Sequence, residues 1–493
     1  MSVDTPAWVR DAVFYQVFPD RFAASVRVPK PGRLEPWSAP PTWHGYKGGD
    51  LLGLAERLDE LVDLGINALY LNPIFQAASN HRYNAYDYFA VDPLLGGDAA
   101  LRELLDAAHA RGIRVVLDGV FNHVGRGFWP FHHVLESGAD SPYRDWFFLE
   151  DAVLDGRAGV RAYDVPWGGP ATERGYRSWW DVPSLPKLRV EHPAVREHLF
   201  SVAEHWLRFG IDGWRLDVPK DIDDPTFWPE FRRRVRAVNP EAYLCGEIWD
   251  EASEWLAGDR FDALMNYPLG IAILGFVGGG ALDQVVIATQ SNYLRALVSL
   301  DGPGFGASLE RAMTVNDPAV TAVQYNLIGS HDTPRARSVM GGSVERLRLA
   351  TLLQLVLPGA PAIYYGDELA MEGTGDPDCR RAYPPVGEPL SEEASAMRAF
   401  ARAAIHARRD HRVLRAGEVR VAAAGERWVV VERTVDDERA VVAINAGDEA
   451  VAVEASTAGM RSIELPGMPP AVVRERGGAV VVPALSGVVL VRG

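Results

Sequence analysis

The sequence predicts an α/β fold, a (β/α)8 TIM barrel, and two observations carry the prediction. About eight short strand-like segments, most of them followed by a helical pattern, occupy most of the 493 residues. The last part of the chain contains only short β-branched segments between turn residues. We therefore expect a barrel with a domain B inserted after its third strand, followed by a C-terminal β-sandwich domain.

The expected barrel strands are short runs of β-branched and aromatic residues. The third of them is apolar on both faces, as parallel strands covered by helices tend to be. The eight strands are expected at 13–18, 66–71, 113–120, 213–218, 243–248, 263–268, 326–330 and 361–365.

Helical patterns fill the intervals between these strands. Leucines at a helical spacing predict a helix over 51–64, and Gly112 closes another over 99–110. Further helices are expected at 193–209, 227–238, 344–357 and 392–410. An open doubly wound sheet is the alternative, but the glycine pairs of the chain lack the strand–glycine–helix context of its phosphate-binding loop.

Two long insertions interrupt the alternation. Residues 122–190 are rich in Trp, Phe, His and Pro and are too long for a connecting loop, which predicts a small domain B. Residues 270–324 separate the sixth and seventh strands and are expected to add helices. The predicted domains are the barrel over 1–121 and 191–410, domain B over 122–190 and the β-sandwich over 411–493.

Composition excludes several classes of partner. A net charge of -16 argues against nucleic acid and anionic membranes, and no apolar run is long enough to span a membrane. The first residues lack the features of a secretory signal, and the two cysteines, Cys245 and Cys379, form neither a disulfide framework nor a metal-ligand spacing. These features predict a cytoplasmic protein without a nucleic-acid or membrane partner.

The most informative stretch is the fourth strand, Gly213-Trp214-Arg215-Leu216-Asp217-Val218. Side chains alternate along a strand, so Arg215 and Asp217 point the same way. A cation beside a carboxylate lowers its pKa, so we expect Asp217 to be ionised and able to act as a nucleophile or base. A buried structural ion pair explains this stretch equally well when it is considered alone.

Matching chemistry at three other strand ends favours the functional interpretation. Residues 118–123 end the third strand and follow it, Glu247 and Trp249 end the fifth, and His331 and Asp332 end the seventh. Reacting groups of such barrels come from these C-terminal strand ends, and gathering unpaired charges there has no structural benefit. Paired carboxylates flanking a bond perform glycoside hydrolysis. Because Glu247 has no cation beside it in sequence, we expect a raised pKa and a proton-donor role.

Several tryptophans lie in loop-like stretches, among them Trp129, Trp146, Trp167, Trp179 and Trp180. Loop aromatics suit the flat faces of sugars, although packing under long loops explains any single one as well.

The four strand-end segments, in this order, resemble the signature regions of the α-amylase superfamily of retaining glycosidases. Residues 14–22, 179–188, 265–268 and 373–381 resemble its cyclomaltodextrinase, neopullulanase and maltogenic amylase group. The resemblance implies hydrolysis of α-1,4 or α-1,6 glucosidic bonds in maltooligosaccharides, cyclodextrins or related α-glucans through a covalent glucosyl-enzyme.

The same resemblance implies roles for single residues. Asp217 would be the nucleophile, Glu247 the general acid/base and Asp332 the third carboxylate of the catalytic set. The residues that would bind the oligosaccharide substrate are Tyr83, His123, Arg215, Trp249, His331, Asp376 and Arg380. Asn84 stands where the family usually has Asp, so a local hydrogen bond there is in question.

Departures from that group concern its N-terminal β domain and its calcium site. The barrel begins within about a dozen residues of Met1, too few for an independent domain, so we expect that domain to be absent. A monomer is then slightly favoured, although the oligomeric state stays open. Residues 23–27 lack the carboxylates of the relatives' calcium-binding run, so no metal site is expected there and no cofactor is required. A structural calcium ion elsewhere stays open, although the sequence does not indicate one.

Two other functions remain open. A transglycosylase or isomerase, such as a trehalose synthase, would use the same intermediate with a sugar as acceptor. A non-catalytic scaffold on the same fold is disfavoured because all three carboxylates are present.

Overall fold

The structure is a computed structural model that describes residues 3–150, 175–474 and 479–492. All eight barrel strands are confirmed, as β1 Phe14–Val17, β2 Ala68–Leu71, β5 Arg114–Gly119, β6 Gly213–Leu216, β7 Tyr243–Gly246, β8 Ala263–Leu264, β9 Tyr325–Leu327 and β10 Ala360–Tyr364. They form one parallel sheet in the order β8-β7-β6-β5-β2-β1-β10-β9. A parallel bridge between Met265 and Tyr325 joins its two edges and closes the barrel.

Side chains fill the interior of this barrel. The ring of Phe14 lies 5.7 Å from that of Tyr243 and 5.3 Å from that of Tyr325, measured between ring centroids. All three residues are buried. The barrel is therefore a packed core rather than a pore, and a site for substrate can form only at its rim.

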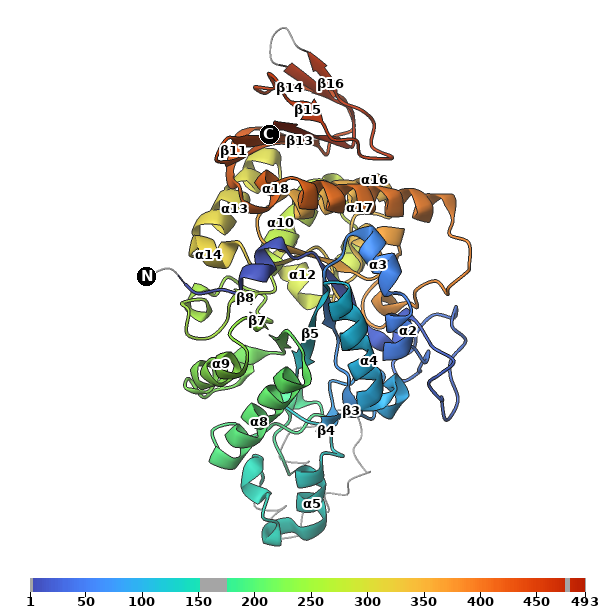
Figure 1. Ribbon diagram of the computed structural model, residues 1–493, viewed down its shortest axis with the longest axis vertical. Helices are drawn as coiled ribbons and strands as arrows, with labels where there is room; N and C mark the ends of the chain where they lie inside the picture. Colours follow the sequence, from blue (N-terminus) through green and yellow to red (C-terminus); the bar gives the residue numbers. More distant parts are fainter. Residues whose placement is uncertain (1–2, 151–174, 475–478, 493) are drawn as a thin grey trace.

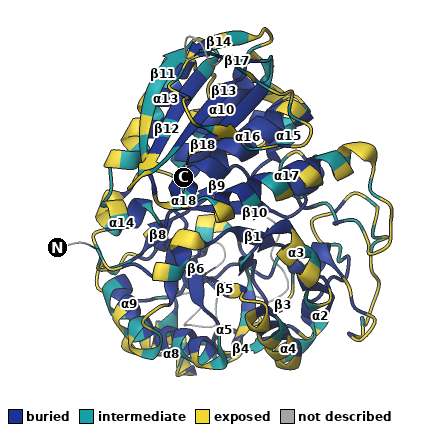
Figure 2. Ribbon diagram, turned by 45° about the horizontal axis from the view of Figure 1, so that its top comes forward, coloured by how far each residue is buried: buried dark blue, intermediate teal, exposed yellow. Residues whose placement is uncertain are grey.

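Helices surround the strands with their exposed faces outward (Figure 2). The predicted helices appear as α4 Gly97–Ala110, α8 Pro193–Phe209, α9 Phe227–Val238, α16 Val344–Val356 and α17 Glu392–Asp410. The single helix predicted over 51–64 is wrong, because the chain forms α2 Leu51–Ala55 and α3 Leu58–Leu64. The break falls at Arg57, whose guanidinium group binds Glu60 and the carbonyl group of Pro384.

The insertions lie at the ends of the barrel strands. A hairpin of β3 Phe75–Ala77 and β4 Ala85–Val91 follows β2 and carries Tyr83 in its loop. The expected helices between β8 and β9 are α10 Tyr267–Gly278, α11 Gln284–Ile287, α12 Ser291–Ala296, α13 Gly302–Thr314 and α14 Pro318–Thr321. The segment predicted as domain B contains α5 Trp129–Ser137, and its residues 151–174, with Trp167, lie outside the described residues.

The C-terminal part begins with a short helix, α18 Arg412–Ala416, and continues as two antiparallel sheets. The five-stranded sheet has the order β11-β12-β13-β18-β15, with bounds Glu418–Gly425, Trp428–Val435, Glu438–Asn445, Ser486–Arg492 and Arg461–Ser462. The three-stranded sheet has the order β14-β17-β16, with bounds Val451–Glu454, Ala479–Val482 and Val472–Arg474. An apolar cluster that includes Val430, Val453 and Val480 lies between them, which confirms the β-sandwich.

These sheets and α5 lie at opposite ends of the long axis of the molecule, with the barrel between them (Figure 1). Nowhere in the described ranges is a helix long and apolar enough to cross a membrane.

Candidate active site

The centre of the site is the buried guanidinium group of Arg215, at the end of β6. It lies 3.0 Å from an oxygen of Asp118, 3.0 Å from one of Asp217 and 3.0 Å from one of Glu247. These side chains come from or directly follow three adjacent strands, β5, β6 and β7. The two carboxylates predicted to react are thus within reach of one cation, as the sequence led us to expect for Asp217 but not for Glu247.

The backbone after β6 turns sharply and binds Glu247. Val218 has φ +35° and ψ 53°, a left-handed conformation that is strained for a β-branched residue. Its N–H group donates to Oε2 of Glu247 at 3.1 Å. The other oxygen of Glu247 accepts from Nε1 of Trp249 at 3.2 Å, and the Trp249 ring stacks on Tyr267 at 3.6 Å. Each oxygen of Glu247 is therefore held by its own donor.

The third carboxylate, Asp332, follows β9 and is the most accessible of the three, with 31% of its side chain exposed. One of its oxygens lies 3.1 Å from Nε2 of His331, and the other lies 3.4 Å from Arg380. Arg380 also pairs with Asp376 at 2.9 Å. Asp332 therefore connects the buried cluster to the Asp376–Arg380 pair, which is expected to bind a glucose unit of the substrate farther toward its non-reducing end.

Two aromatic residues of the predicted set complete the cluster. The hydroxyl group of Tyr83 lies 2.9 Å from Asp118 and 2.5 Å from Nε2 of His331, and the two rings are parallel. His123 lies beside the backbone of Tyr83 and stacks on Trp179 at 5.0 Å. Contacts thus connect all ten predicted site residues in one region at the rim of the barrel.

The electrostatics differ from the expectation at Asp217. Burial, followed by the charge of Glu247, raises the pKa of Asp217 well above its usual value, and Arg215 only partly opposes this. The predicted net lowering of the pKa of Asp217 is therefore wrong, because burial and the charge of Glu247 outweigh the attraction of Arg215. Burial also raises the pKa of Glu247, as expected, and that of Asp332. Such a cluster retains a proton at neutral pH more readily than isolated carboxylates do.

The histidines of the site are uncharged. Burial lowers the pKa of His123 to about 3 and that of His331 well below its usual value. Burial raises the pKa of Asp376 to about 6 in spite of Arg380.

Some of the tryptophans in loops pack against the core, and others are exposed to solvent. Trp146 packs against the main core, as the packing interpretation predicts. Trp180 is 75% exposed and stacks on Trp179, so the rings of His123, Trp179 and Trp180 form a stack that runs from the site to the surface. Such a surface can pack against the apolar face of a sugar ring.

Sequence reasoning missed several polar residues of the cluster. Asp118 lay in a segment that we had singled out, but its partnership with Arg215 required the barrel register. Gln16 in β1 and Asn72 after β2 are buried beside His331 and Tyr83. The only sequence feature that could have indicated Gln16 and Asn72 is a polar residue within or next to an apolar strand. Ser79 donates to Asn84, so the local hydrogen bond in question forms with Asn.

A calcium ion does not fit the segment after β1. Residues 23–27 contain no carboxylate, and the buried Asp50 that contacts them accepts hydrogen bonds from the backbone of Ser25 and Gly53 and pairs with the ammonium group of Lys30 at 3.0 Å. The negative charge of Asp50 is thus already paired with a positive side chain. In the part of the chain that the structure describes, no group of three or more His, Cys, Asp or Glu side chains could hold a metal.

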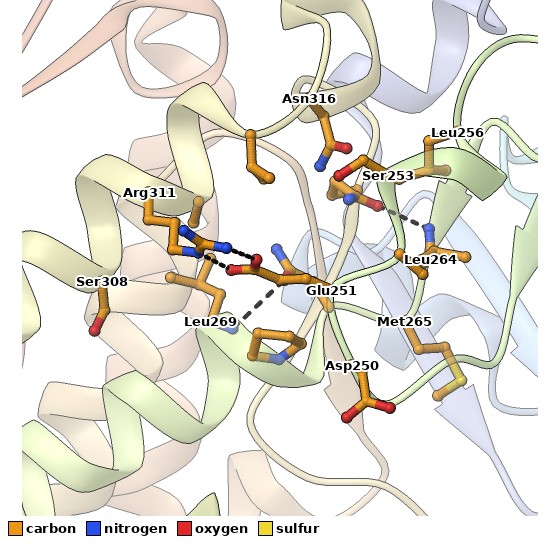
Figure 3. Close-up of a pocket in the computed structure, with 16 residues that line it drawn as sticks. Asp250, Glu251, Ser253, Leu256, Leu264, Met265, Leu269, Ser308, Arg311 and Asn316 are labelled. Atoms are coloured by element: carbon orange, nitrogen blue, oxygen red, sulfur yellow. Dashed lines mark hydrogen bonds and ion pairs between the residues drawn. The ribbon is translucent and has the colours of Figure 1, made fainter.

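A cavity of about 150 Å³ lies next to the site, between residues that follow β7, residues around the end of β8 and helix α13 (Figure 3). Asp250 and Glu251, which follow Trp249, form one wall, and Ser308 and Arg311 of α13 form another. Arg311 pairs with Glu251. Met265 separates the cavity from the carboxylates, since its sulfur lies 3.4 Å from Nε of Arg215.

Comparisons with known proteins agree with this geometry. The family model "Alpha amylase, catalytic domain" matches residues 16–438. The chain is 40% identical over 452 residues to a cyclomaltodextrinase of Geobacillus thermopakistaniensis, covering 91% of this chain and 71% of that protein. The share covered falls to 59% for some other curated relatives.

Two solved structures are similar over almost the whole chain. A crystal structure of a Thermus thermophilus protein has a TM-score of 0.87 and 44% identity, covering 98% of this chain and 99% of that one. The debranching enzyme of Nostoc punctiforme has a TM-score of 0.86 and 40% identity, covering 99% and 100%. With the family model covering most of its length, this chain belongs to the alpha-amylase family and is a glycoside hydrolase of α-glucosidic bonds.

Proposed function

We propose that the protein is a retaining hydrolase of α-1,4 or α-1,6 bonds in maltooligosaccharides, cyclodextrins or related α-glucans. Asp217 is the nucleophile, Glu247 the general acid/base and Asp332 the third carboxylate. The observation that supports this assignment is the gathering of Asp217 and Glu247 around the single cation of Arg215.

The charges of the cluster suit the first half of the reaction. Asp118 and Arg215 neutralise each other, so Asp217 and Glu247 share one negative charge and one proton when the enzyme is ready to react. Asp217 attacks the anomeric carbon while Glu247 gives its proton to the leaving oxygen, and a covalent glucosyl-enzyme forms. The departing sugar carries away the proton, so Glu247 becomes a carboxylate beside the neutral ester of Asp217.

The second half reverses these roles. Glu247 takes a proton from water, the hydroxide oxygen bonds to the anomeric carbon, and Asp217 leaves as a carboxylate. The fixed oxygens of Glu247 suit both steps, because the backbone of Val218 and the Trp249 indole hold the carboxylate in one orientation. Asp332 and His331 lie where hydroxyl groups of the reacting sugar can bind.

The substrate class rests on the relatives and on the rim of the site. One relative is a cyclomaltodextrinase and another a debranching enzyme, so both cyclic substrates and α-1,6 branches are included in the proposal. The exposed stack of Trp179 and Trp180 gives a chain of several glucose units a surface beyond the reacting bond. The predicted cytoplasmic location and monomeric state stay predictions.

Two substitutions test the assignment of the nucleophile and the acid. Asp217→Asn should abolish hydrolysis of maltotriose and of α-glucosyl fluoride, because no covalent intermediate can form. Glu247→Gln should abolish maltotriose hydrolysis but keep cleavage of α-glucosyl fluoride to the intermediate, because fluoride leaves without a proton. Circular dichroism should show that both variants are folded.

Asp250→Asn is the matched control, since Asp250 follows Trp249 but its side chain is 85% exposed. It should keep wild-type rates. If the Asp217→Asn variant still hydrolysed maltotriose, Asp217 would not be the nucleophile. Products longer than maltotriose, seen by chromatography of the wild-type reaction, would show that a sugar replaces water as acceptor.

A further inference from the structure

A closed ring of hydrogen bonds joins Tyr83 and His331 of the site to two buried amide side chains, Gln16 and Asn72, that the reaction described above does not use. Gln16, Asn72 and His331 are almost completely buried, and Tyr83 closes the ring. Buried amide groups are costly unless they are bonded, so the geometry of the ring constrains which atom donates at each contact.

Four contacts make the ring. Nε2 of Gln16 lies 3.2 Å from Oδ1 of Asn72 and 2.8 Å from Nδ1 of His331. Nδ2 of Asn72 lies 3.1 Å from the hydroxyl oxygen of Tyr83. That oxygen lies 2.5 Å from Nε2 of His331.

The direction of each bond follows from Asp118, outside the ring. Burial raises the pKa of Asp118, but Arg215 contacts both of its oxygens at 3.0 and 3.2 Å and opposes that rise, which favours the ionised, accepting form. The hydroxyl groups of Tyr70 and Tyr83 lie 2.6 and 2.9 Å from Oδ2 of Asp118 and must donate to it. Each hydroxyl group has one proton, so the oxygen of Tyr83 can only accept its other bonds.

This constraint passes around the ring. Asn72 must present its NH2 group to Tyr83, which leaves its carbonyl oxygen facing Gln16. Gln16 must then present its own NH2 group, and its second N–H points at Nδ1 of His331. Nδ1 is thereby an acceptor, so the single proton of a neutral imidazole lies on Nε2. The same conclusion follows from the other side, since the oxygen of Tyr83 needs a donor at Nε2.

We propose that Gln16 is a positioning residue that holds His331 in the neutral tautomer with its proton on Nε2, bonded to Tyr83 and close to Asp332. Nε2 also lies 3.1 Å from Oδ2 of Asp332, so a proton on Nε2 attracts the third carboxylate of the site, whereas a bare Nε2 lone pair would repel it. The tautomer is a property of the folded protein. Its effect on turnover rests on the proposed function.

The charges around His331 favour the neutral ring. Burial, Arg380 and Arg215 all lower its pKa, in that order of size, against the carboxylate of Asp332. Cys379 and Arg380 contact its backbone carbonyl, and His81 and Asp118 complete the titratable groups nearby. The wild-type imidazole should therefore not titrate between about pH 5 and 8.

Gln16→Glu tests the role of the amide. A carboxylate at this position can only accept, so it draws a proton onto Nδ1 of His331 and raises the pKa of the ring. Below that raised pKa both nitrogens carry protons, and the contact with Asp332 is kept. Above it the neutral ring keeps its proton on Nδ1, and Nε2 has none to give.

The ratio of the variant's kcat to the wild-type kcat, measured on maltotriose from pH 5 to 8, should therefore fall about tenfold as pH rises. Gln354→Glu is the matched control, because Gln354 is also buried and its amide binds backbone carbonyls, those of Asn326 and Ala362. Its ratio should change little with pH. A flat ratio for Gln16→Glu would overturn the proposal.

The tautomer can also be read directly in the wild-type protein, without any Gln16 variant having to fold. Nitrogen-15 NMR of the histidine rings, with His331 assigned from the signal lost in His331→Gln, should show a protonated Nε2 that is constant from pH 5 to 8. A proton on Nδ1, or titration in that range, would refute the proposal. An inactive wild-type protein with the expected tautomer would instead refute the proposed function alone.

Discussion

The balance of charge at Arg215 controls where the reactive proton resides. Asp118 contacts both the guanidinium group and two tyrosine hydroxyl groups, so it uses most of the attraction that Arg215 can offer. Burial is the main cause of the raised pKa of both Asp217 and Glu247, and the attraction of Arg215 is too small to reverse it. Asp118 therefore adds to the proton affinity of Asp217, behind burial and the charge of Glu247, without reacting itself.

Asp118→Asn should shift the pH dependence of kcat/KM. Without the Asp118 charge, Arg215 stabilises the ionised forms of Asp217 and Glu247 more strongly, so the pair loses its proton at lower pH. The acid must be protonated in the free enzyme, so activity is lost as pH rises through its pKa. We expect this alkaline limb to move down by about one pH unit, equivalent to about 1.4 kcal/mol.

The control for this experiment is Asp250→Asn, an exposed carboxylate whose removal changes the net charge equally. Its alkaline limb should match that of the wild type. An upward shift or no shift for Asp118→Asn, in a variant whose circular dichroism is unchanged, would contradict the proposed balance of charge.

At the scale of elements, two buried arginines bind the end of α16. A helix leaves its last four carbonyl groups without partners. Arg408 of α17 donates to the carbonyl groups of Leu355 and Leu357, and Arg433 of β12 donates to that of Val356. Both guanidinium groups are buried, and the negative end of the helix dipole favours cations there.

Arg433→Met should destabilise the protein. The change keeps much of the apolar volume but leaves the carbonyl groups of Val356 and Gly417 buried with fewer donors. Each unsatisfied group costs about 1 to 3 kcal/mol, so the free energy of unfolding should fall by about 3 kcal/mol. Arg420→Met on β11 is the matched control, because 68% of the Arg420 side chain is exposed. Denaturant titration should detect about 0.5 kcal/mol or less for it.

Local patterns predicted the elements well and their long-range partners poorly. The eight strands are short apolar runs whose signal lies within each segment, so all were found. The break at Arg57 depends on the carbonyl group of Pro384, 327 residues away along the chain, and no local pattern contains it. The pKa of Asp217 was predicted from Arg215 alone, whereas burial and the shared guanidinium group decide it. Gln16 and Asn72 gain their roles only when β1, β2 and the end of β9 meet.

At the scale of the whole molecule, the C-terminal β-sandwich and the barrel share one core. Val429, Val431 and Val442 of the five-stranded sheet belong to the same apolar cluster as the barrel helices. Arg346 of α16 and Arg427 also bind backbone carbonyl groups across this junction. The sandwich therefore packs as one unit with the barrel, although its sequence differs in consisting of short β-branched segments between turn residues.

Val442→Ala should consequently lower the temperature at which enzyme activity is lost. Val442 is fully buried on the face of β13 that packs toward the barrel, and removing its two methyl groups costs about 2 kcal/mol. For a chain of this size, the midpoint of heat inactivation should fall by about 2 °C or more. Val453→Ala, which removes two methyl groups between the two sheets of the sandwich and away from the barrel, should lower the same midpoint if the whole chain unfolds as one unit. If barrel and sandwich unfolded independently, Val442→Ala would leave the inactivation midpoint unchanged and give a second, earlier calorimetric transition. A single transition that moves together with the loss of activity is the expected result, because a shared apolar core cannot be exposed on one side alone.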